Sequence, residues 1–308
     1  DHHVAGLEHR GHRLAGGELG KSVSLWRLEE PAAVSLFRGK WGYRTTVWQL
    51  DMTPDGKTAI WSPPWWSKNH GMEILNLEQG TSRAIETPRH YLAGLRPGHP
   101  QFWRTGAGAM DFFPLPSGDE SLPEQPVLSI PLPAGCRGAN VAFSASGQHF
   151  VVAGPGRKLT AFDLQEPGKP VTLQPLFVTI DASTQGPASA TGGGSVVMSP
   201  DGSRAAAGYN VDGGQPVIWE TGTGKVIHRL DSGPSLLTWS PDGRYLAAAS
   251  NTHVHLYSTA DWSLLWKRTR DSQLTYLGSA SFSGDSSLMA GTMSGSRLDS
   301  DDAVVEKF

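Results

Sequence analysis

Trp239-Ser240-Pro241-Asp242-Gly243 indicates the architecture of the protein, because similar copies of it recur along the chain. The other clear copies are Met52-Thr53-Pro54-Asp55-Gly56 and Met198-Ser199-Pro200-Asp201-Gly202. Divergent or weak copies stand at Phe143-Ser144-Ala145-Ser146-Gly147, Phe282-Ser283-Gly284-Asp285-Ser286, Arg10-Gly11 and Pro97-Gly98. Aligned on the Asp position, they fall at residues 10, 55, 97, 146, 201, 242 and 285. Such a period is typical of a repeat architecture.

Each copy of this phrase predicts a tight turn between two strands. Proline fixes φ, the Asp side chain bonds the backbone ahead of it, and Gly accepts the positive φ that other residues resist. The flanking stretches are apolar, aromatic or β-branched and too short for helices, as in Leu236 to Trp239 and Tyr245 to Ser250 or Val141 to Phe143 and His149 to Ala153. The phrase therefore indicates a β-hairpin.

A third and a fourth strand follow in each unit. Pro216 to Glu220 and Val254 to Tyr257 are examples of the third strand, and Lys225 to Leu230 and Ser263 to Arg268 are examples of the fourth. Four antiparallel strands in about 40 to 45 residues form the blade of a β-propeller. We predict an all-β, seven-bladed β-propeller that takes up residues 1–308 as a single domain.

These units resemble the WD40-repeat family, in a divergent form closer to bacterial members. The likeness lies in the Ser-Pro-Asp-Gly turn, the small second strand and a third strand such as Ile218-Trp219 followed by Thr-Gly. The Gly-His pair of that family occurs only at Gly11-His12 and Gly98-His99, and no third strand ends in Trp-Asp. The resemblance implies a scaffold that holds a protein partner or stands beside an effector or enzymatic domain.

The two ends of the sequence leave the last blade one strand short. Val4 to Leu7 reads as an innermost strand, and Ala303 to Phe308 reads as a third strand. An incomplete blade exposes a strand edge, which native proteins avoid. We therefore expect either a segment of a longer chain whose flanking residues complete the ring, or a last blade of three strands.

Composition limits the classes of function. The net charge is −3 with no basic block, so a nucleic-acid surface is not indicated, and no apolar run is long enough for a membrane span. The single cysteine, Cys136, excludes an internal disulfide. A cytoplasmic location is the expectation, and export with removal of a leader is the alternative.

Candidate binding residues lie in loops that join second and third strands. The loop of the second blade contains Trp65, Trp66, Lys68 and His70. Successive side chains of a strand alternate, so the two adjacent Trp residues cannot both point inward. The loop either anchors a protein partner or a glycan, or its rings fold back over the neighbouring blade.

The corresponding loops of two other blades carry polar side chains. Asn210 and Asp212 lie in the fifth blade, and Asp299, Asp301 and Asp302 precede the final strand. These loops lack the regular oxygen ligands of a calcium loop, so a solvated loop is the simpler interpretation. No metal site and no cofactor are predicted, and the histidines near the start, His2, His3, His9 and His12, read as a solvated terminus.

The absence of catalytic motifs from the sequence favours a binding protein over an enzyme. No Gly-x-Ser-x-Gly occurs. Thr221-Gly222-Thr223-Gly224 reads as a hairpin, and Gly106 to Met110 reads as a Gly-rich strand without the helix that a dinucleotide site needs. We predict a non-catalytic protein-interaction scaffold. A hydrolase or lyase with its site at the central channel and a glycan or small-ligand binder are the alternatives.

Overall fold

The protein is described by a computed structural model. The structure describes residues 4–10, 13–18, 22–29, 32–40, 49–53, 55–62, 71–86, 93–106, 108–116, 123–133, 141–153, 159–173, 196–208, 215–232, 236–249, 253–269, 276–294 and 303–307. All regular structure in these residues is β, as the turn pattern predicts.

The strands of the first half of the chain form antiparallel four-stranded sheets. They are β1 (Val4–Arg10), β2 (Arg13–Glu18), β3 (Ser22–Glu29) and β4 (Ala32–Lys40); β5 (Gln49–Met52), β6 (Thr58–Ser62), β7 (Gly71–Asn76) and β8 (Thr81–Glu86); β9 (Ala93–Leu95), β10 (Gln101–Gly106), β11 (Ala109–Pro114) and β12 (Leu128–Pro131); β13 (Val141–Phe143), β14 (His149–Ala153), β15 (Leu159–Asp163) and β16 (Val171–Thr172).

The second half of the chain continues in the same way. Its strands are β17 (Val196–Met198), β18 (Arg204–Ala207), β19 (Val217–Glu220) and β20 (Val226–Arg229); β21 (Leu236–Trp239), β22 (Tyr245–Ala249), β23 (His253–Ser258) and β24 (Leu264–Thr269); and the three-stranded sheet of β25 (Tyr276–Phe282), β26 (Leu288–Ser294) and β27 (Ala303–Lys307). Within every sheet, strands that are consecutive in the chain are neighbours.

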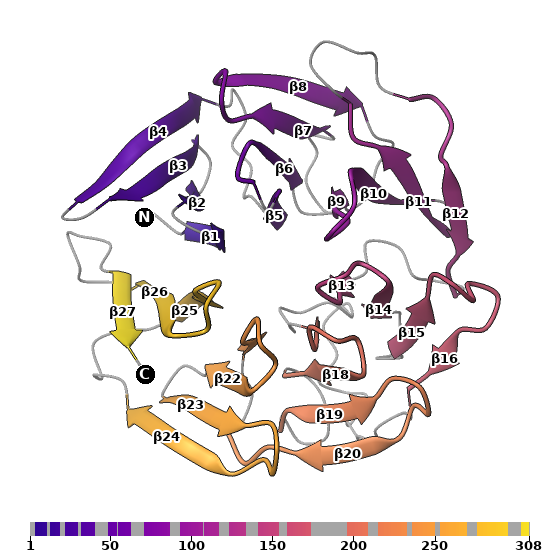
Figure 1. The fold of residues 1–308 in the computed structure, drawn as a ribbon, viewed down its shortest axis with the longest axis vertical. Coiled ribbons are helices and arrows are strands. Elements are labelled where there is room, and N and C mark those ends of the chain that lie inside the picture. Colours follow the sequence, from indigo (N-terminus) through magenta and orange to yellow (C-terminus); the bar gives the residue numbers. More distant parts are fainter. Residues whose placement is uncertain are drawn as a thin grey trace, which may run out of the picture.

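The sheets stand around a common centre in chain order, with the first strand of each sheet innermost (Figure 1). The innermost strands of most neighbouring sheets contact each other, and β1 contacts β25, so the first and the last sheets also meet. This arrangement is propeller-like. The described part of the last sheet has three strands, as the end of the sequence predicted.

Apolar clusters fill the spaces between consecutive sheets, as expected when each sheet is apolar on both faces. Between the β9–β12 and β13–β16 sheets, Phe150 stacks on Phe162 with ring centroids 4.7 Å apart, and Trp103 and Phe112 join them. Comparable clusters lie between the next pairs of sheets, and Trp219 is among the largest fully buried side chains. The sheets are thus held together by side chains of neighbouring blades.

Strands predicted from the sequence agree with the structure at one hairpin and disagree with it at another. The predicted strands Val141 to Phe143 and His149 to Ala153 are confirmed as β13 and β14. The prediction of a strand over Gly106 to Met110 is wrong, because this stretch contains the turn from β10 to β11, where Gly108 has φ 96°. A positive φ breaks an extended strand. Within the described residues, no helix is long and apolar enough to cross a membrane.

Candidate functional site

All predicted binding residues lie outside the described residues. They are Trp65, Trp66, Lys68, His70, Asn210, Asp212, Asp299, Asp301 and Asp302. The strands on either side are described: β6 ends at Ser62 and β7 begins at Gly71, for example. Connections from second to third strands leave a sheet at the end opposite to the Ser-Pro-Asp-Gly turns, which join first and second strands. The strand ends that flank the predicted binding loops therefore lie at the opposite end of each sheet from the repeated turns. Cys136 also lies outside the described residues.

The repeated turns have the backbone conformation that the sequence predicts. The residue after the Asp position has a positive φ in each described copy, namely Gly56 (65°), Gly98 (70°), Gly147 (67°), Gly202 (77°), Gly243 (74°) and Ser286 (63°). This conformation favours glycine because a Cβ atom is crowded there. Ser286 is therefore the exception in the series. The turn from β19 to β20 is also confirmed, with Gly224 at φ 70°.

Where the repeated turn has an aspartate, its carboxylate accepts hydrogen bonds that hold the turn. In the β17–β18 turn, Asp201 Oδ1 accepts hydrogen bonds from Ser199 Oγ at 2.6 Å and from the backbone N–H of Ser203 at 3.0 Å. Ser199 Oγ in turn accepts the backbone N–H of Arg204 at 2.9 Å. The turns at Asp55, Asp242 and Asp285 repeat the first two bonds with nearly the same lengths. These acids serve the scaffold.

Those hydrogen bonds lower the pKa values of the turn carboxylates. Burial alone would raise the pKa of Asp242, but hydrogen bonds from Ser240 and Arg244 and the charge of Arg244 lower it to about 2. Hydrogen bonds from Ser283 and Ser287 lower the pKa of Asp285 to about 2. All of these groups are therefore ionised at neutral pH.

Neighbouring turns are also connected to one another. Arg96 Nε donates to the Gly147 carbonyl at 3.0 Å, the Ala145 N–H donates to the Pro200 carbonyl at 2.9 Å, and the Asp242 N–H donates to Ser286 Oγ at 3.1 Å. Each of these bonds joins one sheet to the next. The turn face is thus a connected polar network as well as a set of hairpins.

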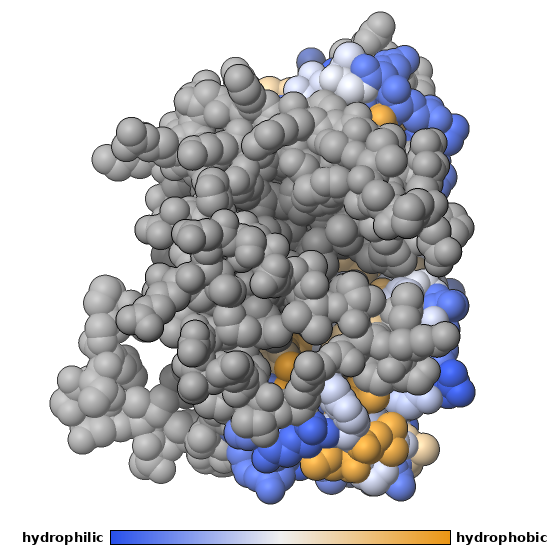
Figure 2. All heavy atoms as spheres, turned by 90° about the vertical axis from the view of Figure 1, so that its left-hand side faces the viewer, coloured by the Kyte–Doolittle hydropathy of each residue, from blue (hydrophilic) through white to orange (hydrophobic). Residues whose placement is uncertain are grey.

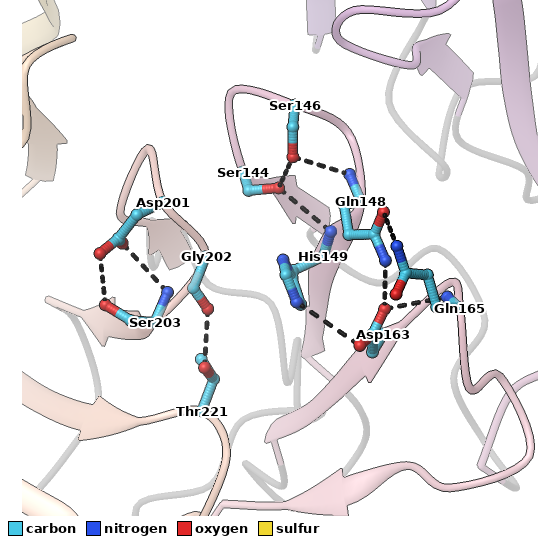
Figure 3. A network of polar contacts seen from close by, with 10 residues as sticks. All are labelled: Ser144, Ser146, Gln148, His149, Asp163, Gln165, Asp201, Gly202, Ser203 and Thr221. Atoms are coloured by element: carbon cyan, nitrogen blue, oxygen red, sulfur yellow. Dashed lines mark hydrogen bonds and ion pairs between the residues drawn. The ribbon is translucent and has the colours of Figure 1, made fainter.

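Figure 3 shows one section of this face, where the β13–β14 and β17–β18 turns lie side by side. Gln148 Nε2 donates to Asp163 Oδ1 at 2.6 Å, and His149 Nε2 lies 3.7 Å from Asp163 Oδ2. Gln165 donates its backbone N–H to Asp163 at 2.9 Å. The acid joins β14 to the end of β15, so its partners indicate a structural role.

A histidine and a tyrosine, His255 and Tyr257, are buried together in the β21–β24 sheet. His255 is 5% exposed, and its Nδ1 lies 3.1 Å from Tyr257 Oη, while its Nε2 has no hydrogen-bond partner among the described residues. Burial, followed by the charges of Lys267 and His253, lowers the pKa of His255. Burial also raises the pKa of Tyr257. Both side chains are therefore neutral at neutral pH, and His255 can donate or accept one further hydrogen bond.

The outer strand β24 exposes apolar side chains next to a cation. Leu264 and Leu265 are 49% and 51% exposed, and Lys267 follows them. The register explains the exposure: Tyr257 pairs with Leu264 and Leu256 pairs with Trp266, so Leu265 is the extra residue of a β-bulge. Figure 2 shows apolar residues in orange beside hydrophilic ones in blue at the lower end of the molecule, where β24 lies in Figure 1.

The same bulge recurs in the outer strands of other sheets. In β20 the extra residue is Ile227, which is 41% exposed, and in β4 it is Leu36. The sequence predicts strands at Lys225 to Leu230 and at Ser263 to Arg268, but the bulge in them was not predicted. Two apolar neighbours in one short edge strand, as at Leu264-Leu265, are the signal that could have indicated it, because a regular strand alternates.

Comparison with known proteins gives no family: neither a family model nor a curated protein matches the chain. No group of three or more metal-ligating side chains occurs among the described residues.

Proposed function

We propose that the chain is a seven-bladed, divergent WD40-like propeller that acts as a non-catalytic protein-interaction module, in which the outer edge of the β21–β24 sheet contributes a docking surface. The order of the sheets around one centre and the repeated turn support the architecture. A ring held by a network of hydrogen-bonded turns is a rigid support for surface contacts, as repeat proteins commonly are.

The observation that carries this proposal is the exposed pair Leu264 and Leu265 at the bulge of β24. Single exposed apolar residues are ordinary on protein surfaces. Here two are adjacent in one edge strand, and Trp266 beside them is half-buried. Aromatic and apolar side chains at a protein surface are the usual anchors of a protein interface.

The bulge also indicates how a partner binds. An extra residue interrupts the regular row of N–H and C=O groups along the strand edge, and native proteins use bulges to prevent strand addition. The partner therefore contacts side chains and does not extend the sheet. Lys267 is exposed in the same strand, and Arg268 follows it in sequence. The matching partner is an amphipathic segment with acidic residues beside its apolar ones.

The test begins with identification of the partner. A photo-crosslinking amino acid at position 265 of the full chain captures the partner, which is then purified and titrated calorimetrically. The double variant Leu264→Ser and Leu265→Ser should weaken binding by at least about tenfold, equivalent to about 1.4 kcal/mol. The matched control is Val127→Ser, because Val127 is 57% exposed and lies before β12 in another sheet. It should bind as the native chain does.

Further variants distinguish the β24 surface from the predicted binding loop of the second blade, which contains Trp65 and Trp66. Trp65→Ala and Trp66→Ala should leave the dissociation constant unchanged. If they abolish binding while the double Leu variant retains full affinity, the loop that contains Trp65 is the docking site and the edge proposal fails. Lys267→Glu should weaken binding most at low salt, because a rim charge acts through screened attraction.

A further inference from the structure

The outer strand β24 is held in its sheet from one side. Among the described residues it pairs with β23 and with no other strand. The bulge at Leu265 interrupts this pairing, and Leu264 and Leu265 are exposed. Segments with few buried apolar contacts open at a lower free-energy cost than the core of a protein. β24 is thus the strand of this sheet that detaches most easily.

A buried histidine lies directly opposite a lysine of this strand. His255 on β23 pairs with Lys267 on β24, so both side chains are on the same face of the sheet. His255 is buried and Lys267 is exposed. Like charges at directly opposite positions of an antiparallel pair destabilise the pairing. A neutral imidazole avoids this repulsion, and a protonated one creates it.

The surroundings of His255 also leave a second ring proton without an acceptor. Nδ1 lies 3.1 Å from Tyr257 Oη, and Nε2 is buried with no hydrogen-bond partner in the described part of the chain. An imidazolium carries an N–H on both nitrogens. Its Nε2–H would be a buried, charged donor without a partner, and such a group strongly disfavours the closed sheet.

The charged groups around the ring compensate little for this cost. Burial is the largest cause of the lowered pKa of His255, followed by the charges of Lys267 and His253, whose ring centre is 5.7 Å from that of His255. Asp231, which follows β20, favours the imidazolium, but it is exposed to solvent and its charge is therefore screened. From β22, the residue opposite His255 is the uncharged Ala248.

We propose that protonation of His255 releases β24 from β23 in mildly acidic solution, which makes the outer edge of this sheet acid-sensitive. The release also displaces Leu264 and Leu265 and therefore weakens partner binding, and this second step rests on the proposed docking surface. The repeated turns are not the cause, because the pKa values of Asp242 and Asp285 are about 2.

The direction of the pH effect follows from the lowered pKa of His255. The closed strand resists the proton, and the opened strand accepts it near the ordinary value of 6.5. The closed strand therefore has its full stability above that pH and loses stability as the pH falls toward the folded pKa. Each pH unit inside this window raises the ratio of opened to closed strand by about tenfold.

Hydrogen exchange measured by mass spectrometry tests the release on the full chain without a partner. Exchange of the β24 amides is compared at about pH 7.5 and about pH 5, after correction for the intrinsic effect of pH on exchange. Protection of β24 should fall by about tenfold or more. The internal control is β8, an outer strand of equal length that contains no histidine, and its protection should not change. Unchanged protection of β24, or an equal loss in β8, overturns the proposal.

Variants show whether His255 is the group that takes up the proton. His255→Phe keeps a ring that cannot titrate, so β24 should stay protected at both pH values. Lys267→Gln is exposed, so it keeps the test open if His255→Phe does not fold, and it should reduce the loss of protection because the like charge is gone. His99→Gln is the matched control, since His99 is exposed in the turn after β9, and it should behave as the native chain does. A native-sized loss of protection in either the folded His255→Phe or the Lys267→Gln variant overturns the proposal.

The consequence for docking is measured separately with the purified partner. Its affinity for the native chain should fall by about tenfold or more at about pH 5, and its affinity for His255→Phe should not. Unchanged affinity for the native chain at a pH where β24 has opened contradicts the docking surface on β24 and leaves the acid-induced release in place.

Discussion

The β13–β14 and β17–β18 turns occupy the same place in neighbouring sheets, but they are held in different ways (Figure 3). In the second turn, Asp201 Oδ1 receives Ser199 Oγ at 2.6 Å and the Ser203 N–H at 3.0 Å. In the first, Ser146 stands in place of the acid, and its Oγ lies 3.3 Å from Ser144 Oγ and 3.3 Å from the Gln148 nitrogen. A charged acceptor makes shorter and stronger bonds than a hydroxyl.

A neighbouring sheet packs against the β13–β14 turn with backbone and against the β17–β18 turn with a side chain. A Cβ atom on Gly147 would lie 2.1 Å from the Pro97 carbonyl oxygen, and one on Gly202 would lie 2.4 Å from His149 Nδ1. In the β21–β22 turn, by contrast, a Cβ atom on Gly243 would meet nothing closer than Pro200 Cδ at 3.7 Å. Arg96 also donates to the Gly147 carbonyl. The same turn conformation therefore forms with a carboxylate or with a serine at this position, and a neighbouring sheet packs closely against both turns.

The largest loss of stability is expected when the space at Gly147 is filled. Gly147→Ala places a methyl group against backbone that cannot move aside, so we expect a loss of about 3 kcal/mol or more in the free energy of unfolding. Gly243→Ala has only the strain of a positive φ and should lose about 1 to 2 kcal/mol. Urea unfolding followed by Trp fluorescence measures both. Equal losses would show that inter-sheet contact does not support the first turn.

The next largest effect should come from neutralising the acid in the second turn. Asp201→Asn keeps the shape but removes the charge, and we expect a loss of about 1 to 2 kcal/mol at neutral pH because charge-assisted hydrogen bonds become ordinary ones. Ser146→Ala, at the same place in the neighbouring sheet, removes the weaker bonds and should cost less. A larger loss for Ser146→Ala, measured by the same urea titration, would reverse the comparison.

The turn acids also predict how stability depends on pH. Folding lowers the pKa values of Asp55, Asp201, Asp242 and Asp285, to about 2 for the last two. A group with a lowered pKa in the folded state stabilises the fold above its unfolded pKa, which is 3.8 for Asp, and loses this contribution as the pH falls toward the folded value. The melting temperature should therefore drop between about pH 4 and pH 2. Asp201→Asn should drop less steeply than the native chain.

Much of the fold can be predicted from the sequence because the turns are local. Pro241, Asp242 and Gly243 each favour the turn through their own chemistry, and the apolar runs beside them are short, so the hairpin can be read without its neighbours. Gly106 to Met110 shows the limit of such reading. Small residues suit a strand and a turn alike, and only the pairing of β10 with β11 decides between them.

The candidate sites are less predictable because they depend on contacts between distant segments. The exposure of Leu265 follows from the register of β23 and β24, where a one-residue shift leaves it unpaired. The sequence pattern instead indicated irregular loops such as the one that contains Trp65, and those lie outside the described residues.

Ser286 allows a finer test of what the turn conformation itself costs. Its φ of 63° strains a residue with a Cβ, while its Oγ accepts the Asp242 N–H from the neighbouring sheet at 3.1 Å. Ser286→Ala keeps the strain and loses the bond, so it should cost about 1 kcal/mol. Ser286→Gly relieves the strain as it loses the bond, and the net change should lie within about 0.5 kcal/mol of zero. Thermal unfolding of both variants decides the matter. Equal losses would mean that the positive φ carries no strain.

The smallest expected effect is a gain in stability. It comes from a substitution that makes the β13–β14 turn resemble the β17–β18 turn. Ser146→Asp gives the β13–β14 turn the carboxylate that its neighbour has, so Ser144 Oγ and the Gln148 N–H can donate to a charged acceptor. The new charge also lies near the Arg96 guanidinium, which bonds the adjacent Gly147 carbonyl. We expect about 0.5 to 1 kcal/mol of added stability at neutral pH, because charged hydrogen bonds replace neutral ones at an exposed site. The gain should vanish as the pH falls below the pKa of the new acid, and urea unfolding at both pH values measures this. A gain that persists in acid would come from turn propensity alone and not from the charge.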